Sequence, residues 1–163
     1  MLRPFVSLST RLGVTPDAVS VIAFALAGGA SAAFYLGGAD PIWYFAGAVL
    51  VFLNGWLDLL DGALARELGT DSKAGDLLDH VLDRYADIVI IAGVAAGVDR
   101  YALGLAAVTG VLMTSYLGTQ AQAVGLDRVY GGLLGRADRL ALVGVAGVVA
   151  AVQRFYYAWT ALS

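Results

Sequence analysis

The chain has 163 residues, of which 60% are hydrophobic and only 14% are charged, and its mean hydropathy is +0.77. Because soluble domains carry about 25% charged residues, this composition indicates an integral membrane protein. The net charge of −3 argues against a nucleic-acid-binding protein, which needs a basic face. The absence of cysteine and the single histidine, His80, exclude disulfides and metal sites built from thiolates or several imidazoles.

Five apolar stretches are interpreted as membrane-spanning helices, each of which needs roughly 20 residues. They cover residues 17–38, 41–66, 75–98, 100–124 and 139–152, and the last merges into the aromatic segment 155–159. Thr15 and Pro16 form a helix start signal before the first stretch. Residues 1–14 are expected to lie at the membrane interface. The sequence therefore predicts one integral membrane domain, 1–163, with an all-α fold: a polytopic membrane helix bundle with five clear spans.

The length of the chain leaves a sixth span open. Only eleven residues follow Val152, which is too few for another crossing of about 20 residues. Residues 153–157 are better explained as an interfacial anchor. A last helix is therefore missing, shortened or absorbed into the fifth stretch.

Basic residues gather on one side of the predicted bundle. They stand before the first span, between the second and third, and between the fourth and fifth: Arg3, Arg11, Arg66, Lys73, Arg128, Arg136 and Arg139. The opposite loops hold only Arg100. By the positive-inside rule, the N-terminus and the loop between the second and third spans are cytoplasmic. We therefore expect a multi-pass protein of the cell membrane with an active site that faces the cytoplasm.

Four aspartates stand at helical spacing in the second and third spans. Asp58 and Asp61 are three residues apart and Asp79 and Asp83 are four apart, so each pair shares one helix face, and Asn54 extends the first face by a turn. A carboxylate at the centre of a membrane helix costs about 2.5–3.5 kcal/mol to insert, so such a cluster needs a neutralising partner. The short connection predicts antiparallel helices with the two acidic pairs facing each other. Oxygen ligands of this kind suit two Mg²⁺ or Mn²⁺ ions.

The acids belong to a longer pattern, DxxDGxxAR followed by GxxxDxxxD, which covers residues 58–83. This pattern resembles the signature of the CDP-alcohol phosphotransferase family at every defined position. A single DxxD could be a solvated helix end, but that explanation does not account for the whole pattern. The resemblance implies an enzyme that joins a CDP-linked lipid to the hydroxyl of an acceptor alcohol and releases CMP.

The resemblance also implies roles for individual residues. Asp83 would be the general base that deprotonates the acceptor hydroxyl. Arg66 has a guanidinium group that can fork to phosphate oxygens. The implied metal ligands are Asp58, Asp61, Asp79 and Asp83. The residues implied to hold cytidine and pyrophosphate are Asp61, Gly62, Ala65, Arg66, Gly75 and Asp79.

A basic motif between the fourth and fifth spans bears on the acceptor. Residues 131–139 resemble the stretch that grips the acceptor phosphate in the inositol-phosphate-using branch of the family. Arg136 and Arg139 are three residues apart, so both can face one anion, although positive-inside anchoring explains either arginine equally well. Gln120 and Gln122 stand where that branch tends to carry basic residues. The expected acceptor is inositol phosphate or glycerol phosphate, and the lipid is based on diacylglycerol or, as in an archaeal member, on archaeol.

Two other functions stay open on the sequence. Intramembrane acids form relays in ion or proton transporters, although here no matching ionisable residue stands near the far side of the second and third spans. A chain without its last helix would also be compatible with a non-catalytic membrane scaffold.

Three further features fall within the third span. Gly93 and Gly97 form a GxxxG pair, for which packing within the chain is favoured and a homodimer is left open. Asp87 continues the acidic face and is predicted to pair with an arginine, because an unpaired acid at that depth is costly. His80 lies off this face and is expected to be structural.

Overall fold

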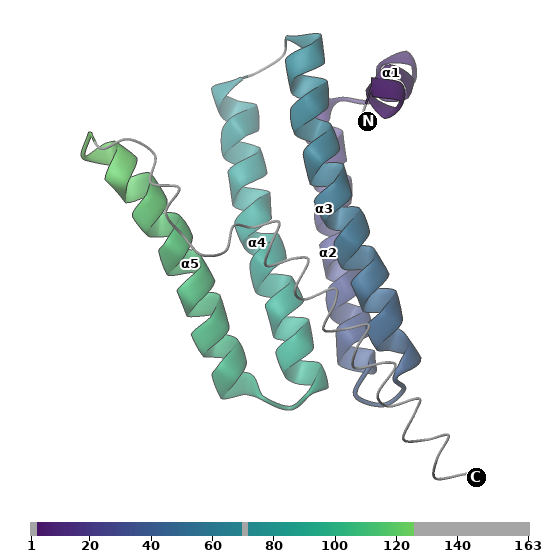
Figure 1. Ribbon diagram of the computed structural model, residues 1–163, viewed down its shortest axis with the longest axis vertical. Coiled ribbons are helices and arrows are strands. Elements are labelled where there is room, and N and C mark those ends of the chain that lie inside the picture. The colour runs from purple at the N-terminus through teal and green to yellow at the C-terminus, as the bar shows by residue number, and fades with distance from the viewer. Residues whose placement is uncertain (1–2, 70–71, 126–163) are drawn as a thin grey trace.

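The computed structural model describes residues 3–69 and 72–125, which form five α-helices and, within these ranges, no strand. The helices are α1 (Arg3–Arg11), α2 (Pro16–Leu36), α3 (Ile42–Leu68), α4 (Lys73–Gly97) and α5 (Tyr101–Ala123). Figure 1 shows α2 to α5 as long helices that run up and down beside one another. The short α1 lies at the end of the bundle where α3 connects to α4.

The predicted spans between residues 17 and 124 are confirmed as helices α2 to α5, with every boundary within two residues. Helices α2 and α3 and residues Tyr101–Gln120 of α5 are long and apolar enough to cross a membrane. These apolar helices indicate a multi-pass membrane protein. Helix α4 has 25 residues but is less apolar, because its first half carries the acids. The fifth predicted span, 139–152, and the question of a sixth lie outside the described residues.

Local signals explain where the helices begin and end. Thr15 caps α2 by accepting a hydrogen bond from the Ala18 amide at 3.3 Å, and Pro16 takes the first helical position as predicted. Ser72 caps α4 by accepting from the Gly75 amide at 2.9 Å. Gly69 ends α3 with a φ of 61°, a left-handed conformation that glycine adopts without steric cost. The chain therefore reverses within a few residues, and the acidic part of α3 lies at the same end of the bundle as the acidic part of α4.

Helix α2 is the centre of the described fold, because α3 and α4 both pack against it. The core between them combines small and large side chains: Ala27, Ala30, Phe34, Tyr44, Val51, Ala86 and Ile90. Small residues on α2 let the neighbouring helices come close, which is how helices gain contact in lipid, where no water drives them together. The acidic faces of α3 and α4 are thereby set against the first half of α2.

Gly93 and Gly97 give α4 its close approach to α2. A side chain at Gly93 would collide with the backbone of Ser31, and one at Gly97 would collide with the carbonyl of Phe34. This face is therefore used within the chain, which is the interpretation that the sequence favoured. A homodimer would need a different face.

Helix α1 docks on α3 next to the acidic residues. Val6 is buried with Leu60 and Leu64, and the ring of Phe5 meets that of Trp56 edge-on, with centroids 4.8 Å apart. The interfacial position of residues 1–14 stays a prediction.

Gly93→Ala is expected to destabilise the protein, because the added methyl group meets backbone that moves only if α2 and α4 separate. Overpacking a tight core costs roughly 1–3 kcal/mol, so the midpoint of thermal unfolding in detergent should fall. Gly110→Ala is the matched control, because no described residue lies against the position of the added methyl group in α5 and alanine is the better helix former. Equal losses in the two variants would contradict the close α2–α4 contact.

Candidate functional site

Three of the four predicted metal ligands lie together in the half of the bundle nearest the α3–α4 turn. One carboxylate oxygen from each of Asp58, Asp61 and Asp79 lies within 4.8 Å of the other two. Asp61 is buried, with 5% of its surface exposed, and the other two are half-buried. Carboxylates this close repel one another and lose hydration, so the arrangement favours a bound counter-charge.

Helix α2 holds one of these carboxylates in place. The hydroxyl of Ser20 donates a 2.8 Å hydrogen bond to Asp61 Oδ2, and both groups are buried. The same hydroxyl lies 3.2 Å from the carbonyl of Pro16, one turn earlier in α2. The sequence analysis missed Ser20. The available signal was a polar residue inside an apolar span, which usually faces the bundle interior.

The cluster borders a small cavity that α2, α3 and α4 enclose. The polar residues that line it are Ser20, Asn54, Asp58, Asp61, Asp79 and Asp83. Asp83 thus shares the cavity but lies outside the group of three whose oxygens are within 4.8 Å. Its role as a ligand or base stays a proposal.

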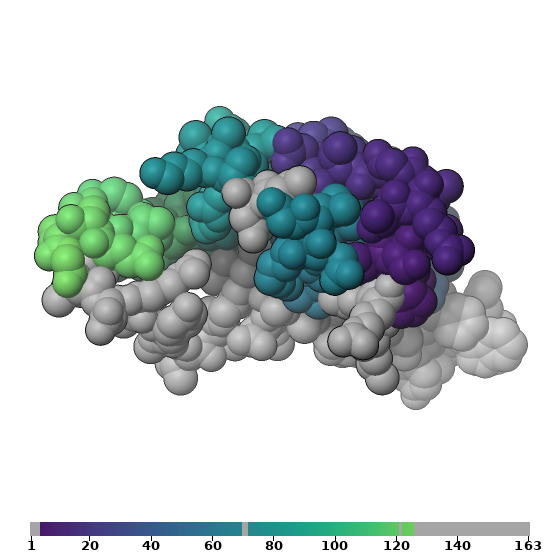
Figure 2. Space-filling model, turned by 90° about the horizontal axis from the view of Figure 1, so that it is seen from above, coloured from purple at the N-terminus to yellow at the C-terminus, as the bar shows by residue number. Residues whose placement is uncertain are grey.

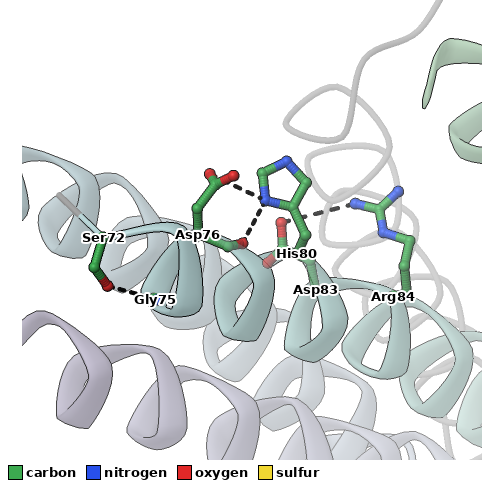
Figure 3. Close-up of polar contacts among 6 residues, drawn as sticks. All are labelled: Ser72, Gly75, Asp76, His80, Asp83 and Arg84. Atoms are coloured by element: carbon green, nitrogen blue, oxygen red, sulfur yellow. Dashed lines mark hydrogen bonds and ion pairs between the residues drawn. The ribbon is translucent and has the colours of Figure 1, made fainter. Parts of the chain in front are cut away.

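Arg84 lies between two of the acids on α4. Its Nη2 is 3.7 Å from Asp83 Oδ2, a contact drawn in Figure 3, and 3.8 Å from Asp87 Oδ2. The prediction that Asp87 pairs with an arginine is confirmed. Because Asp87 is almost fully buried, this partner offsets part of the cost of a carboxylate at that depth.

His80 contacts Asp76 instead of the cluster (Figure 3). Its Nδ1 lies 2.7 Å from the Asp76 carbonyl oxygen and 3.5 Å from Asp76 Oδ1, and both side chains are exposed. These contacts agree with the structural role predicted for His80.

The donor set of the cluster fits a hard divalent cation. Asp58, Asp61 and Asp79 supply carboxylate oxygens, which Mg²⁺ and Mn²⁺ prefer. Ser20 supplies the kind of outer hydrogen bond that orients a ligating carboxylate. Among residues 3–69 and 72–125, no other three side chains of this kind lie as close together.

A larger cavity of about 680 Å³ opens beside the cluster. Its lining includes all six residues predicted to hold the nucleotide: Asp61, Gly62, Ala65, Arg66, Gly75 and Asp79. The volume falls within the range of about 300–1,000 Å³ that small-molecule sites occupy. Asp61 and Asp79 belong both to the cluster and to the wall of this cavity, so the two sites adjoin each other.

The larger cavity also has a wall that the sequence analysis did not predict. Its other lining residues are Thr15, Pro16, Asp17, Ser20, Leu68, Ser72, Lys73 and Asp76. Figure 2 looks onto this end of the molecule, where the N-terminal residues, in purple, lie beside the teal ends of α3 and α4. The N-terminus of α2 therefore forms part of the wall, and Lys73 adds a second cation to Arg66. Basic side chains favour a bound phosphate.

The two arginines predicted to hold the acceptor phosphate, Arg136 and Arg139, lie outside the described residues.

A sequence model of the CDP-alcohol phosphatidyltransferase family matches residues 13–163. The chain belongs to this family. The membership predicted from the aspartate and glycine pattern is therefore confirmed. Family membership also argues against the transporter that the sequence alone left open.

Several relatives within the CDP-alcohol phosphatidyltransferase family are identical to this chain at about a third of the aligned residues. Phosphatidylinositol phosphate synthase of Streptomyces avermitilis is 33% identical over 95% of this chain and 65% of its own length. Archaetidylinositol phosphate synthase of Pyrococcus horikoshii is 34% identical over 93% of this chain and 79% of its own length. This chain thus spans slightly less than two thirds of the Streptomyces relative.

Solved structures of the family are also similar. The phosphatidylinositol phosphate synthase of Mycobacterium tuberculosis with CDP-DAG bound matches with a TM-score of 0.72 and 27% identity, over 98% of this chain and 94% of that one. A structure of the same enzyme with manganese and citrate matches with a TM-score of 0.73, over 98% of this chain and 90% of that one.

Ser20→Ala is expected to weaken Mn²⁺ binding, because it removes the hydrogen bond that orients Asp61. Loss of an outer partner of a ligand typically lowers metal affinity by about 10–100-fold, and we expect the lower end of that range. The dissociation constant can be measured in detergent from the electron paramagnetic resonance signal of free Mn²⁺. Thr109→Val is the matched control, because the hydroxyl of Thr109, on an exposed face of α5, donates to the Leu105 carbonyl and has no other hydrogen bond within the described part of the chain. Unchanged affinity in Ser20→Ala would show that Asp61 needs no support from α2.

Proposed function

We propose that this family member transfers a phosphatidyl or archaetidyl group from a CDP-linked lipid to inositol phosphate or glycerol phosphate and releases CMP. The observation that carries the proposal is that the carboxylate cluster borders the larger cavity. Asp61 and Asp79 lie both in the carboxylate cluster and on the wall of the 680 Å³ cavity. A diphosphate held beside Arg66 and Lys73 in that cavity would therefore lie next to the cluster.

Inositol phosphate is the acceptor that we place first. The bacterial and the archaeal relative are named for different lipids but for the same inositol phosphate head group. Residues 131–139 support the same choice through their resemblance to the acceptor-binding stretch of that branch. Glycerol phosphate, a second phosphoalcohol, is the competing acceptor.

We propose that Asp58, Asp61, Asp79 and Asp83 hold two divalent ions, Mg²⁺ or Mn²⁺. Three of these carboxylates already form a compact group, and Asp83 lines the same cavity. When bound, such ions neutralise phosphate charge and polarise the phosphorus–oxygen bonds. Manganese in the related Mycobacterium tuberculosis structure supports this assignment.

The side chains around the ions have separate roles in the proposal. Arg66 and Lys73 bind the diphosphate oxygens of the CDP-lipid. Gly62 and Ala65 are small residues, which leave room in the cavity for the substrate. Asp83 accepts the proton of the acceptor hydroxyl as that oxygen bonds to the phosphorus of the lipid phosphate. The bond from this phosphorus to the CMP oxygen breaks in the same step, so CMP leaves with its phosphate.

We further propose that the site faces the cytoplasm. The described basic residues Arg11, Arg66 and Lys73 lie towards the same end of the bundle as the carboxylates, while Arg100 lies at the other end, between α4 and α5. By the positive-inside rule, the end of the bundle with more basic residues faces the cytoplasm.

Asp79→Asn is expected to abolish metal-dependent release of CMP from a CDP-lipid in the presence of inositol phosphate. Loss of several kcal/mol of charge stabilisation corresponds to a rate decrease on the order of 100-fold or more. Chelation of divalent ions should stop the wild-type enzyme in the same assay, and added Mg²⁺ or Mn²⁺ should restore it.

Asp99→Asn is the matched control for this assay. Asp99 lies in the turn between α4 and α5, and its φ of 54° is one that asparagine adopts readily. The same chemical change there should leave turnover unaltered. Full activity of Asp79→Asn, or of the wild type in excess chelator, would contradict the proposed function.

Asp83→Asn is expected to lower turnover much more than CDP-lipid binding. A base acts in the transition state, whereas ground-state binding is shared among Arg66, Lys73 and the rest of the cavity. Single-turnover kinetics with equilibrium binding of CDP-lipid separate the two effects. Weak binding with normal turnover at saturation would make Asp83 a substrate ligand and not the base.

Arg136→Ala and Arg139→Ala are expected to raise the KM for inositol phosphate. A hydrogen bond to a charged group contributes about 1.5–3 kcal/mol, which corresponds to roughly tenfold to over a hundredfold in KM. The KM for the CDP-lipid should change little. Arg128→Ala serves as the control for loss of positive charge from the same stretch. If the acceptor KM stays constant in both variants, these arginines are topological anchors.

A further inference from the structure

Asn54 is a polar residue that the proposed mechanism does not use. It lies in α3 one turn before Asp58, and only 1% of its surface is exposed. Its amide Nδ2 donates a 2.8 Å hydrogen bond to the carbonyl of Ala23 in α2. Its Oδ1 is buried and has no hydrogen-bond partner among the described residues.

The orientation of the Asn54 amide follows from its neighbours. The carbonyl of Ala23 can only accept, so the nitrogen of the amide must face it. A flipped amide would place two acceptors against each other and would lose the bond to Ala23. The unsatisfied atom is therefore the oxygen, and it needs a donor or a cation.

Asn54 lines the small cavity that also contains the carboxylate cluster. The free volume of this cavity is about 10 Å³, which is close to the volume needed for one water molecule. Its other polar lining consists of Ser20 and the four aspartates, and the Ser20 hydroxyl donates to Asp61. Because ionised carboxylates and an amide oxygen only accept, the cavity favours an occupant that brings protons or positive charge.

We propose that Asn54 belongs to the divalent cation site as an outer partner: its Oδ1 accepts a hydrogen bond from a water ligand of the ion that Asp58, Asp61 and Asp79 hold. Mg²⁺ gives up its waters reluctantly and is usually bound through a few carboxylates together with retained waters. Such a water directs its oxygen to the ion and its two protons to acceptors. Asn54 and a carboxylate of the same cavity supply those acceptors. This inference rests on the cation site of the proposed function.

The same side chain ties α2 to α3, so Asn54 is a positioning residue with two contacts. The bond to Ala23 fixes the amide plane and thereby aims Oδ1. An outer partner that is itself held in place orients a metal ligand most effectively. A residue that served only to join the helices would affect stability and leave metal affinity unchanged.

Asn54→Leu tests the inference, because leucine has the same branched arrangement of heavy atoms and no polar atom. Mn²⁺ affinity is measured without substrate, from the electron paramagnetic resonance signal of the free ion in detergent. The dissociation constant should rise by about tenfold or more. Asn54→Ser, which keeps a neutral oxygen, should stay closer to the wild type than Asn54→Leu. Thermal unfolding in chelator reports the loss of the α2–α3 tie separately.

Asp58→Asn in the same titration distinguishes failure of this inference from failure of the cation site. If Asp58→Asn loses Mn²⁺ and Asn54→Leu binds it as the wild type does, the Asn54 proposal is overturned and the cation site stands. If both Asp58→Asn and Asn54→Leu bind Mn²⁺ as the wild type does, the proposed cation site is wrong, and the proposal for Asn54 is wrong as well. Asn54→Val applies the same test with a smaller apolar side chain if the leucine variant does not fold.

Discussion

Mutual repulsion among three aspartates within 4.8 Å of one another is the constraint on which the rest of this structure depends. Each carboxylate loses hydration in a mostly apolar bundle, and like charges at this distance repel one another. The surroundings reduce this cost without removing it. Ser20 donates to Asp61, Asn54 and the remaining acids border the same cavity, and Arg84 offsets the charge deeper in α4. A divalent cation is the neutralising partner that the donor set fits best, so the chemistry of the family follows from the same constraint.

Helix α2 makes this arrangement possible because both acidic helices pack against it. Its alanines and the glycines of α4 bring the backbones close, and the close contact at Gly93 and Gly97 fixes where α4 lies along α2. The first turns of α2 then form one wall of the larger cavity, opposite the motif residues of α3 and α4. A single helix thus sets the distance between the carboxylates and shapes the pocket proposed for the nucleotide.

Local patterns in the sequence predicted most of the fold. Runs of apolar residues predicted α2 to α5, and the Thr15–Pro16 start signal is used as expected. The spacing of Asp58 and Asp61 predicted a shared helix face, because three or four residues make one helical turn, and the short connection to the next helix predicted that Asp79 would meet them. Contacts between distant residues could not be predicted in this way. Ser20 and Asp61 are 41 residues apart, and Asn54 and Ala23 are 31 apart, so these pairs depend on how the helices rotate and slide against each other. The same limit explains why the sequence did not show that Asp83 lies outside the group of three, or that Thr15, Asp17 and Lys73 line the larger cavity.

The most direct test of the account is a crystal structure of the protein soaked in Mn²⁺, with anomalous diffraction recorded at the manganese edge. The account predicts anomalous density between α3 and α4, bounded by the carboxylates of Asp58, Asp61 and Asp79. Two peaks there would agree with the proposed pair of ions, with Asp83 beside the second. Density confined to exposed acids such as Asp76, or none within the cluster, would contradict the claim that these aspartates form the metal centre of the enzyme.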